Sequence, residues 1–227
     1  MNILITGANR GIGYALTVEL ANQGHRVFAS SRKIGRQLRC LSLEYRDVLV
    51  YEMDVSKENS VRETAQQMAR YDDNLDVVVS NAGILIPGDR EATVFSLDSQ
   101  ALEAMLQVNV IGAARVIRYF SPLIRSNGLF ATITSEAGSI SNTFSSMPGY
   151  AVSKAAENKL VAIQNISETK YRSIAIHPGR VDTDMNRESA EIAPSECAKD
   201  LADILTGKKK LPEKEWFFNY LGEPMQH

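Results

Sequence analysis

Cysteine is scarce in this 227-residue chain, which has only Cys40 and Cys197. Two cysteines so far apart are typical of reduced thiols and not of the disulfide frameworks that staple small secreted domains. We therefore expect a reducing compartment, and the sequence predicts a cytoplasmic protein.

Long apolar runs are absent as well. No stretch approaches the roughly 18 apolar residues that a membrane-spanning helix needs. A first strand that begins at Asn2 leaves no room for the charged, apolar and small-residue regions of a signal peptide. The sequence therefore predicts no membrane partner.

Neither sign of charge is in excess. The 25 Lys and Arg residues against 27 Asp and Glu residues give a formal net charge of −2, and the longest block of like charge is the lysine triplet at 208–210. Because nucleic-acid binding relies on basic side chains that neutralise phosphates, we expect no nucleic-acid partner. No metal site is predicted either.

Short apolar runs, in contrast, recur along the chain. Runs rich in aliphatic and β-branched residues occupy 2–6, 26–30, 48–53, 76–80, 129–134 and 172–177, and the aromatic-rich run 216–220 could add a seventh. Their nearly continuous apolar character is typical of parallel strands that helices cover on both faces. Each run is therefore predicted to form a buried strand.

Helical patterns alternate with these strands. Apolar residues at three-and-four spacing are clearest at 99–124 and at 150–166. Alternating strands and helices, without a linker-like segment, predict an α/β protein: a single doubly wound Rossmann domain over 1–227, with a mostly or wholly parallel sheet of six to seven strands and helices on both faces. Such a sheet binds its ligand at the carboxyl ends of the strands.

A glycine-rich segment follows the first strand directly. It reads T-G-A-N-R-G-I-G over residues 6–13 and continues into a helix predicted over 12–22. Gly7 permits a tight turn, Gly11 lets the backbone approach a pyrophosphate, and Gly13 lets the helix pack closely on the sheet. The amide-rich helix N-terminus attracts an anion. A glycine cluster after a strand can also be an ordinary turn.

The G-x-x-x-G-x-G spacing resembles that of the short-chain dehydrogenase/reductase family, which binds NAD or NADP. The resemblance implies that Asn9 and Ile12 of this loop also contact the cofactor. It further implies an adenine contact at Asp54 and Val55 and a sheet-steadying element beside the cofactor at Asn81, Ala82 and Gly83. Asn-Ala-Gly taken alone is compatible with a simple turn.

The end of the second strand bears on the choice of cofactor. An NAD enzyme usually has an acidic residue there, which binds the ribose 2′-hydroxyl. This chain has Ser30, Ser31, Arg32 and Lys33 instead. The guanidinium of Arg32, and that of Arg10 in the glycine loop, can hold a 2′-phosphate by charge-assisted hydrogen bonds. NADP is therefore favoured over NAD, although arginines after strands are often only solvated.

Tyr150 and Lys154 stand in Y-A-V-S-K, a spacing that places both side chains on one helix face, one turn apart. A tyrosine hydroxyl has a reference pKa of about 10 and is a poor base at neutral pH, but an ammonium within about 4–6 Å favours the phenolate. The pair predicts a proton donor or acceptor at Tyr150 that Lys154 activates.

The family resemblance extends this pair to a catalytic set. Ser135, after the fifth strand, matches the serine that hydrogen-bonds the substrate oxygen, and Asn109 matches the residue that holds a water linking Lys154 to a proton relay. Lys154 is implied to bind the nicotinamide ribose as well. Taken singly, each of these residues is compatible with a purely structural role. Their conjunction in the expected order makes coincidence improbable.

The segment H-P-G-R-V-D-T-D-M at 177–185 resembles the family's nicotinamide-flanking segment. The match implies that Pro178 and Gly179 shape the turn and that Thr183 and the backbone of Val181 contact the carboxamide. His177 is interpreted as a packed strand-end residue in preference to the alternative, an acid or base. By position alone, the expected substrate-pocket residues are Glu136, Ser145, Met147, Arg180 and Met185.

The sequence thus predicts an NADP-dependent oxidoreductase that moves a hydride between the nicotinamide ring and a carbonyl or alcohol carbon of a small molecule. The chain most resembles the small carbonyl-reductase-like subgroup. A non-catalytic NADP-binding redox sensor remains an alternative, whereas a nucleotide-sugar epimerase would need a longer chain. The apolar surface of the helix at 101–124 favours a homodimer or a homotetramer.

Overall fold

The computed structural model describes residues 1–70, 74–186 and 190–227. Seven strands form one sheet in the order β3-β2-β1-β4-β5-β6-β7, and every pairing is parallel. The strands are β1 (Asn2–Thr6), β2 (Arg26–Ser31), β3 (Val48–Glu52), β4 (Leu75–Ser80), β5 (Ile124–Ile133), β6 (Arg172–His177) and β7 (Phe217–Asn219). The predicted parallel α/β sheet is confirmed, including its aromatic seventh strand.

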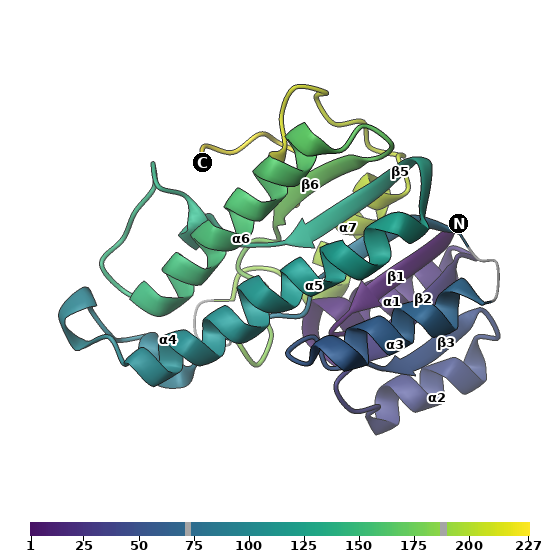
Figure 1. Ribbon diagram of the computed structural model, residues 1–227, viewed down its shortest axis with the longest axis horizontal. Coiled ribbons are helices and arrows are strands. Elements are labelled where there is room, and N and C mark those ends of the chain that lie inside the picture. The colour runs from purple at the N-terminus through teal and green to yellow at the C-terminus, as the bar shows by residue number, and fades with distance from the viewer. Residues whose placement is uncertain (71–73, 187–189) are drawn as a thin grey trace.

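Helices cover both faces of the sheet (Figure 1). They are α1 (Gly11–Asn22), α2 (Arg36–Glu44), α3 (Glu58–Ala69), α4 (Ser99–Met105), α5 (Ile111–Phe120), α6 (Pro148–Ser167) and α7 (Pro194–Leu205). Alternate residues of β1 belong to different cores: Ile3 and Ile5 pack with residues of α1, α2 and α7, whereas Leu4 packs with residues of α3 and α5. This explains why the strands read as continuous apolar runs, because both faces are buried.

The helical stretch predicted over 99–124 is confirmed over 99–120, but it is not α-helical throughout. A five-residue π-helical segment, η3 (Leu106–Val110), separates α4 from α5, and α5 ends at Phe120. Pro122 follows in a short 3-10 turn, η4 (Ser121–Leu123). Because Pro122 has no N–H to continue the α-helical hydrogen-bond ladder, the α-helix gives way to this turn, although Ser121 itself keeps helical dihedrals.

The start of the fifth strand also differs from the prediction. β5 begins at Ile124, which pairs with Leu75, and the register shifts before Val77 pairs with Leu129. Asn127 lies inside this irregularity with a φ of 64°. A left-handed residue and a polar stretch interrupt the apolar pattern, and for this reason the sequence indicated a strand only from residue 129.

The helices are too short or too polar to cross a lipid bilayer; this holds for all helices within residues 1–70, 74–186 and 190–227.

Neither Cys40 nor Cys197 is part of a disulfide, and burial raises the pKa of the Cys197 thiol to about 12. Both thiols are therefore free, as the sequence predicted.

Candidate functional site

A cleft of about 520 Å³ lies at the carboxyl ends of the strands. Its walls come from the glycine loop, the ends of β2, β3 and β4, the start of α6 and the segment after β6. The predicted residues that line it are Gly7, Asn9, Arg10, Gly11, Ile12, Gly13, Ser31, Arg32, Asp54, Val55, Asn81, Ala82, Gly83, Tyr150, Lys154, Pro178 and Thr183. The fold therefore gathers motifs from the whole length of the chain around one cavity.

The glycine loop is built for close approach. Gly7 has a φ of 70°, a left-handed conformation that glycine adopts without strain. A Cβ on Gly13 would lie 2.5 Å from the side-chain nitrogen of Asn81 and 2.6 Å from the carbonyl oxygen of Gly7. Asn81 in turn donates to the carbonyl oxygen of Thr6 at 2.8 Å. Asn81 thus clamps the loop at the N-terminus of α1.

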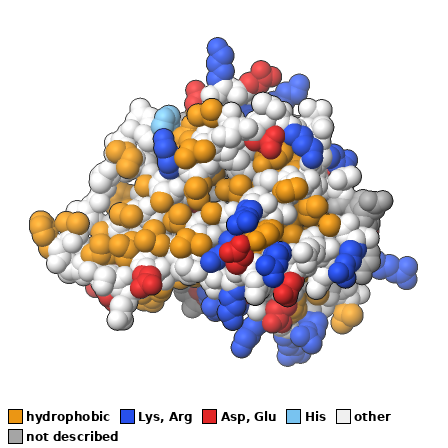
Figure 2. All heavy atoms as spheres, viewed as in Figure 1, with side chains coloured by type: hydrophobic (Ala, Val, Ile, Leu, Met, Phe, Trp, Pro, Cys, Tyr) orange, Lys and Arg blue, Asp and Glu red, His pale blue; other side chains and the backbone are white. Residues whose placement is uncertain are grey.

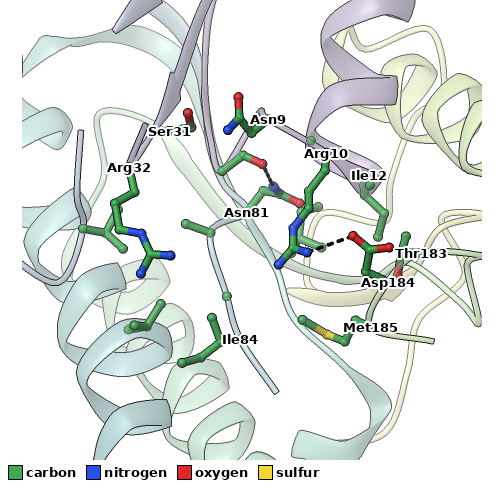
Figure 3. A pocket seen from close by; sticks show the side chains of 18 of the residues that line it. Asn9, Arg10, Ile12, Ser31, Arg32, Asn81, Ile84, Thr183, Asp184 and Met185 are labelled. Atoms are coloured by element: carbon green, nitrogen blue, oxygen red, sulfur yellow. Dashed lines mark hydrogen bonds and ion pairs between the residues drawn. The ribbon is translucent and has the colours of Figure 1, made fainter. Parts of the chain in front are cut away.

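Asn9 shapes the end of the cleft that lies beside the segment after β2. Its side-chain amide donates to the carbonyl oxygen of Lys33 at 2.6 Å and its carbonyl oxygen accepts from the backbone N–H of Gly35 at 2.8 Å. The Ser31 hydroxyl also donates to the Lys33 carbonyl at 2.7 Å. These bonds fix the segment after β2 beside the glycine loop, and Arg32 projects from that segment into the cleft (Figure 3).

Arg10 faces the other wall. Its guanidinium lies 2.8 Å from the carboxylate of Asp184, and the two side chains are 73% and 47% exposed (Figure 3). An exposed ion pair of this kind contributes roughly 0–1 kcal/mol. The pair is therefore weak enough for Arg10 to exchange Asp184 for another anion.

A buried carboxylate holds the start of α6. Asp89, in the 3-10 turn η1 (Pro87–Asp89), accepts from the backbone N–H of Gly149 at 3.0 Å and from that of Tyr150 at 2.8 Å. Asp89 is only 3% exposed. Because the first N–H groups of a helix lack partners within it, this carboxylate satisfies two of them and complements the helix dipole. Asp89 thereby fixes the backbone from which Tyr150 projects into the cleft.

Lys154 lies below Tyr150 on the same face of α6. Its Nζ is 5.8 Å from the centre of the Tyr150 ring and donates to the carbonyl oxygen of Ile133 at 3.1 Å. Nζ also donates to Oε2 of Glu157 at 2.6 Å. Burial lowers the pKa of Lys154, but Glu157 and, less strongly, Tyr150 outweigh burial and raise this pKa above its ordinary value. Burial raises the pKa of the Glu157 carboxyl, against the lowering effect of Lys154.

Ser135 and Asn109 do not line the cleft, although Ser135 directly follows the lining residue Thr134. The Ser135 Oγ accepts from the backbone N–H of Ala137 at 3.1 Å, which leaves its O–H able to donate. The buried Asn109 side chain accepts from the Ile84 N–H and donates to the Ile84 carbonyl oxygen and to the Ser153 hydroxyl, at 2.8, 2.9 and 2.9 Å. Asn109 therefore joins η3 to the segment after β4 and to α6.

Gly179 and Val181 also lie outside the cleft. A Cβ on Gly179, whose φ is 80°, would lie 2.6 Å from the side chain of Ile192, and Val181 forms a bridge with the same residue.

His177 is largely buried, and its Nδ1 accepts from the backbone N–H of Glu136 at 3.2 Å. Burial lowers the pKa of His177, although Glu136 opposes this effect.

Only Met185 of the five positions expected to form the substrate pocket lines the cleft. Glu136 and Arg180 instead face each other at 3.9 Å and do not line the cleft. Part of the segment between Thr183 and Pro194, which was expected to cover the substrate, lies outside the described residues.

A family model described as short chain dehydrogenase matches residues 1–193. The chain belongs to this family. It is therefore an oxidoreductase that acts on small molecules, and the family implies NAD(P)-dependent hydride transfer.

Individual relatives agree with this assignment. The chain is 34% identical over 194 residues to an uncharacterized oxidoreductase of Schizosaccharomyces pombe, and the matched region covers 82% of this chain and 75% of the relative. It is 28% identical over 189 residues to an NADPH-dependent pterin aldehyde reductase of Arabidopsis thaliana, covering 81% and 76% of the two chains. The structure of the carbonyl reductase Sniffer of D. melanogaster superposes with a TM-score of 0.90 at 25% identity, covering 100% of this chain and 99% of that one.

Three acidic residues of this short-chain dehydrogenase were missed by the sequence analysis. Asp89 and Asp184 contact residues that are far away in the sequence, so no local pattern indicated their positions. Glu157 did carry a signal: it lies three residues after Lys154 and seven after Tyr150, on the same face of one helix. Helix geometry alone therefore predicts that the Glu157 carboxylate lies beside Lys154, without information on the tertiary structure.

Proposed function

We propose that this chain is a cytoplasmic NADP-dependent reductase, a single domain over 1–227, that transfers a hydride between NADP(H) and a carbonyl or alcohol carbon of a small molecule. The observation that carries the proposal is that Tyr150 and Lys154 line the same cleft as the glycine loop and Arg32. Proton-transfer groups and nucleotide-binding groups therefore share one cavity.

The residues present fit NADP(H). The space that a Cβ would fill at Gly13 lets α1 pack against Asn81 and the Gly7 carbonyl, so the loop and its N–H groups stand close to a pyrophosphate. Arg32, with no acidic residue beside it at the end of β2, suits a 2′-phosphate. Arg10 can join it by leaving the exposed pair with Asp184. NADPH dependence of the Arabidopsis relative supports the same choice.

The remaining cleft residues are assigned by position. Asp54 and Val55 would contact the adenine, and Asn81, Ala82 and Gly83 would steady the sheet beside the cofactor. Pro178 and Gly179 would shape the turn beside the nicotinamide, and Thr183 and the backbone of Val181 would contact its carboxamide. When bound, NADP(H) supplies or accepts the hydride.

Tyr150 is proposed as the general acid of reduction and the general base of oxidation. The ammonium of Lys154 stabilises negative charge on the phenol oxygen as its proton leaves. Ser135 can donate its hydroxyl hydrogen to the substrate oxygen while its Oγ keeps the Ala137 contact. Because the Asn109 side chain is used by Ile84 and Ser153, its part in a relay would fall to its main chain in the π-helical segment.

Turnover assays test this proposal directly. The purified protein is expected to oxidise NADPH with at least some members of a panel of aldehydes and ketones, and to prefer NADPH to NADH. The assay follows the loss of absorbance of the reduced nicotinamide. Tight NADPH binding without turnover of any carbonyl or alcohol would contradict the reductase and favour a non-catalytic sensor.

A homodimer is proposed through α5 and α6. Apolar side chains form a band over these helices in Figure 2. Ile111 on α5 is 42% exposed, and on α6 Val152 and Ile163 are each 50% exposed and Ile166 is 84% exposed. A contiguous apolar face of this kind on two neighbouring helices is typical of a protein–protein interface. The same arrangement is compatible with a tetramer built from two such dimers.

Sedimentation at micromolar concentration tests the interface. We expect the wild-type chain to sediment as a dimer or tetramer and the double variant Ile163→Asp, Ile166→Asp to sediment as a smaller species, because burying two carboxylates is costly. Leu43→Asp is the matched control, since Leu43 is 83% exposed on α2. A monomeric wild-type profile would refute the interface.

A further inference from the structure

The inward face of α6 carries an ion pair that the proposed chemistry does not by itself require. Nζ of Lys154 and Oε2 of Glu157 are 2.6 Å apart, and the two side chains are only 4% and 1% exposed. Lys154 lines the cofactor cleft, whereas Glu157 lies one helical turn deeper and does not line it. The carboxylate therefore reaches Lys154 from the protein side and leaves the cleft side open.

Removal of this carboxylate would leave Lys154 in a poor environment. The other acceptor of its ammonium among the described residues is the carbonyl oxygen of Ile133, at 3.1 Å, which is uncharged. A buried ammonium with only neutral acceptors is strongly disfavoured and tends to lose its proton. The negative charge of Glu157 thus offsets the free-energy cost of burying a protonated lysine in the folded protein.

Other titratable groups near α6 have different partners. Asp89 in η1 accepts from the N–H groups of Gly149 and Tyr150. In η5 (Glu136–Gly138), Glu136 lies 4.0 Å from His177 at the end of β6. Further away, Glu103 on α4 is exposed and Arg172 on β6 donates to carbonyl oxygens of the segment before β7. The charged groups that act on Lys154 are Glu157 and, on ionisation, Tyr150.

We propose that Glu157 is a positioning residue that serves as the counter-ion of Lys154, keeping the ammonium charged and directed at the cofactor cleft. Two of the three N–H bonds of Nζ are then held by Glu157 and Ile133. The third is left to point toward the ribose and the Tyr150 oxygen. The inference deepens the proposed function and rests on it for the role of Lys154, but its first test needs neither cofactor nor turnover.

The first test measures stability against pH. In the wild type the raised pKa of Lys154 contributes stability that is complete below the unfolded-state value and is lost as pH rises through the folded-state value. Without the carboxylate, burial alone lowers the pKa of Lys154, so that the lysine destabilises the fold at neutral pH and this penalty fades as pH rises toward the unfolded-state value. The melting-temperature deficit of Glu157→Gln should therefore be largest at pH 7 and shrink toward pH 10.

A double variant separates pairing from packing. Lys154→Met combined with Glu157→Gln removes the unpaired ammonium and is expected to melt at a higher temperature than Glu157→Gln alone. Glu63→Gln, an exposed neutralisation on α3, is the matched control and should melt like the wild type at both pH values. If Glu157→Gln does not fold, the double variant should still fold. Failure of both, or a deficit that is the same at pH 7 and pH 10, would overturn the proposal.

The second test measures NADPH binding and turnover against pH. For Glu157→Gln, the pH above which NADPH affinity and kcat decline should fall by at least about one unit relative to the wild type, because Lys154 loses its proton more readily. Glu157→Asp keeps the charge and should restore most of the wild-type profile. A uniform loss of kcat with an unmoved profile would assign Glu157 a purely structural role. A wild type that binds NADPH but reduces nothing would refute the proposed function and leave the stability and binding tests intact.

Discussion

Replacement of Tyr150 by phenylalanine is expected to abolish carbonyl reduction while leaving the affinity for NADPH nearly unchanged. The change removes one oxygen, and a positioned general acid contributes roughly 10²–10⁴-fold to the rate. The helix start should survive, because Asp89 binds the backbone N–H groups of Gly149 and Tyr150 and not the phenol. Single-turnover rates of NADPH oxidation and fluorescence titration of NADPH measure the two effects separately.

Two further variants calibrate this result. Tyr119→Phe removes the same atom from a surface tyrosine that donates to Glu58 at 2.6 Å, and it should keep wild-type turnover. Lys154→Ala should harm both turnover and NADPH binding. It also leaves Glu157 buried without its partner, which costs about 3–5 kcal/mol of stability, so its binding is measured at a temperature where it remains folded. Equal turnover of wild type and Tyr150→Phe would refute the mechanism.

Arg32→Ala is expected to weaken NADPH binding by about 1.5–3 kcal/mol, the size of a hydrogen bond to a charged group, and to leave NADH binding almost unaffected. The reason is that the guanidinium projects into the cleft from the segment that Asn9 and Ser31 hold in place. The dissociation constants of both cofactors, measured by fluorescence titration, give the change in preference.

The controls for Arg32 use other arginines. Arg39→Ala removes an exposed arginine from α2, outside the cleft, and should leave both cofactors unaffected. Arg10→Ala should weaken NADPH less than Arg32→Ala does, because Arg10 must first give up its contact with Asp184. If the ratio of NADPH to NADH affinity is the same in Arg32→Ala and in wild type, other residues select the cofactor.

Much of the fold was predictable because its signals are local. All six strands predicted from apolar runs exist, five of them within one residue of their expected bounds, and β7 follows from its aromatic run; only β5 starts five residues earlier than expected. The helical stretch predicted over 99–124 is helical as far as Phe120, but the π-helical segment η3 inside it was not predicted, because apolar periodicity continues through η3 and does not register a π-helical turn. Pro122 is the residue of the sequence that indicates a helix end near Phe120.

The sequence by itself determined which residues are candidates for the chemistry and at which edge of the sheet they gather. The glycine spacing after β1 and the four-residue interval between Tyr150 and Lys154 are local features that can be read directly from the sequence. The carboxyl ends of parallel strands all lie at one edge of the sheet, so the motifs that follow the strands meet there. Only the tertiary structure decided which side chains reach the cavity. It kept Asn109 and Ser135 out of the cleft lining, paired Arg10 with Asp184 and placed the Asp89 carboxylate at the N-terminus of α6. Hydrogen bonds and ion pairs between segments far apart in the chain depend on packing, and they leave no periodic trace in the residues that form them.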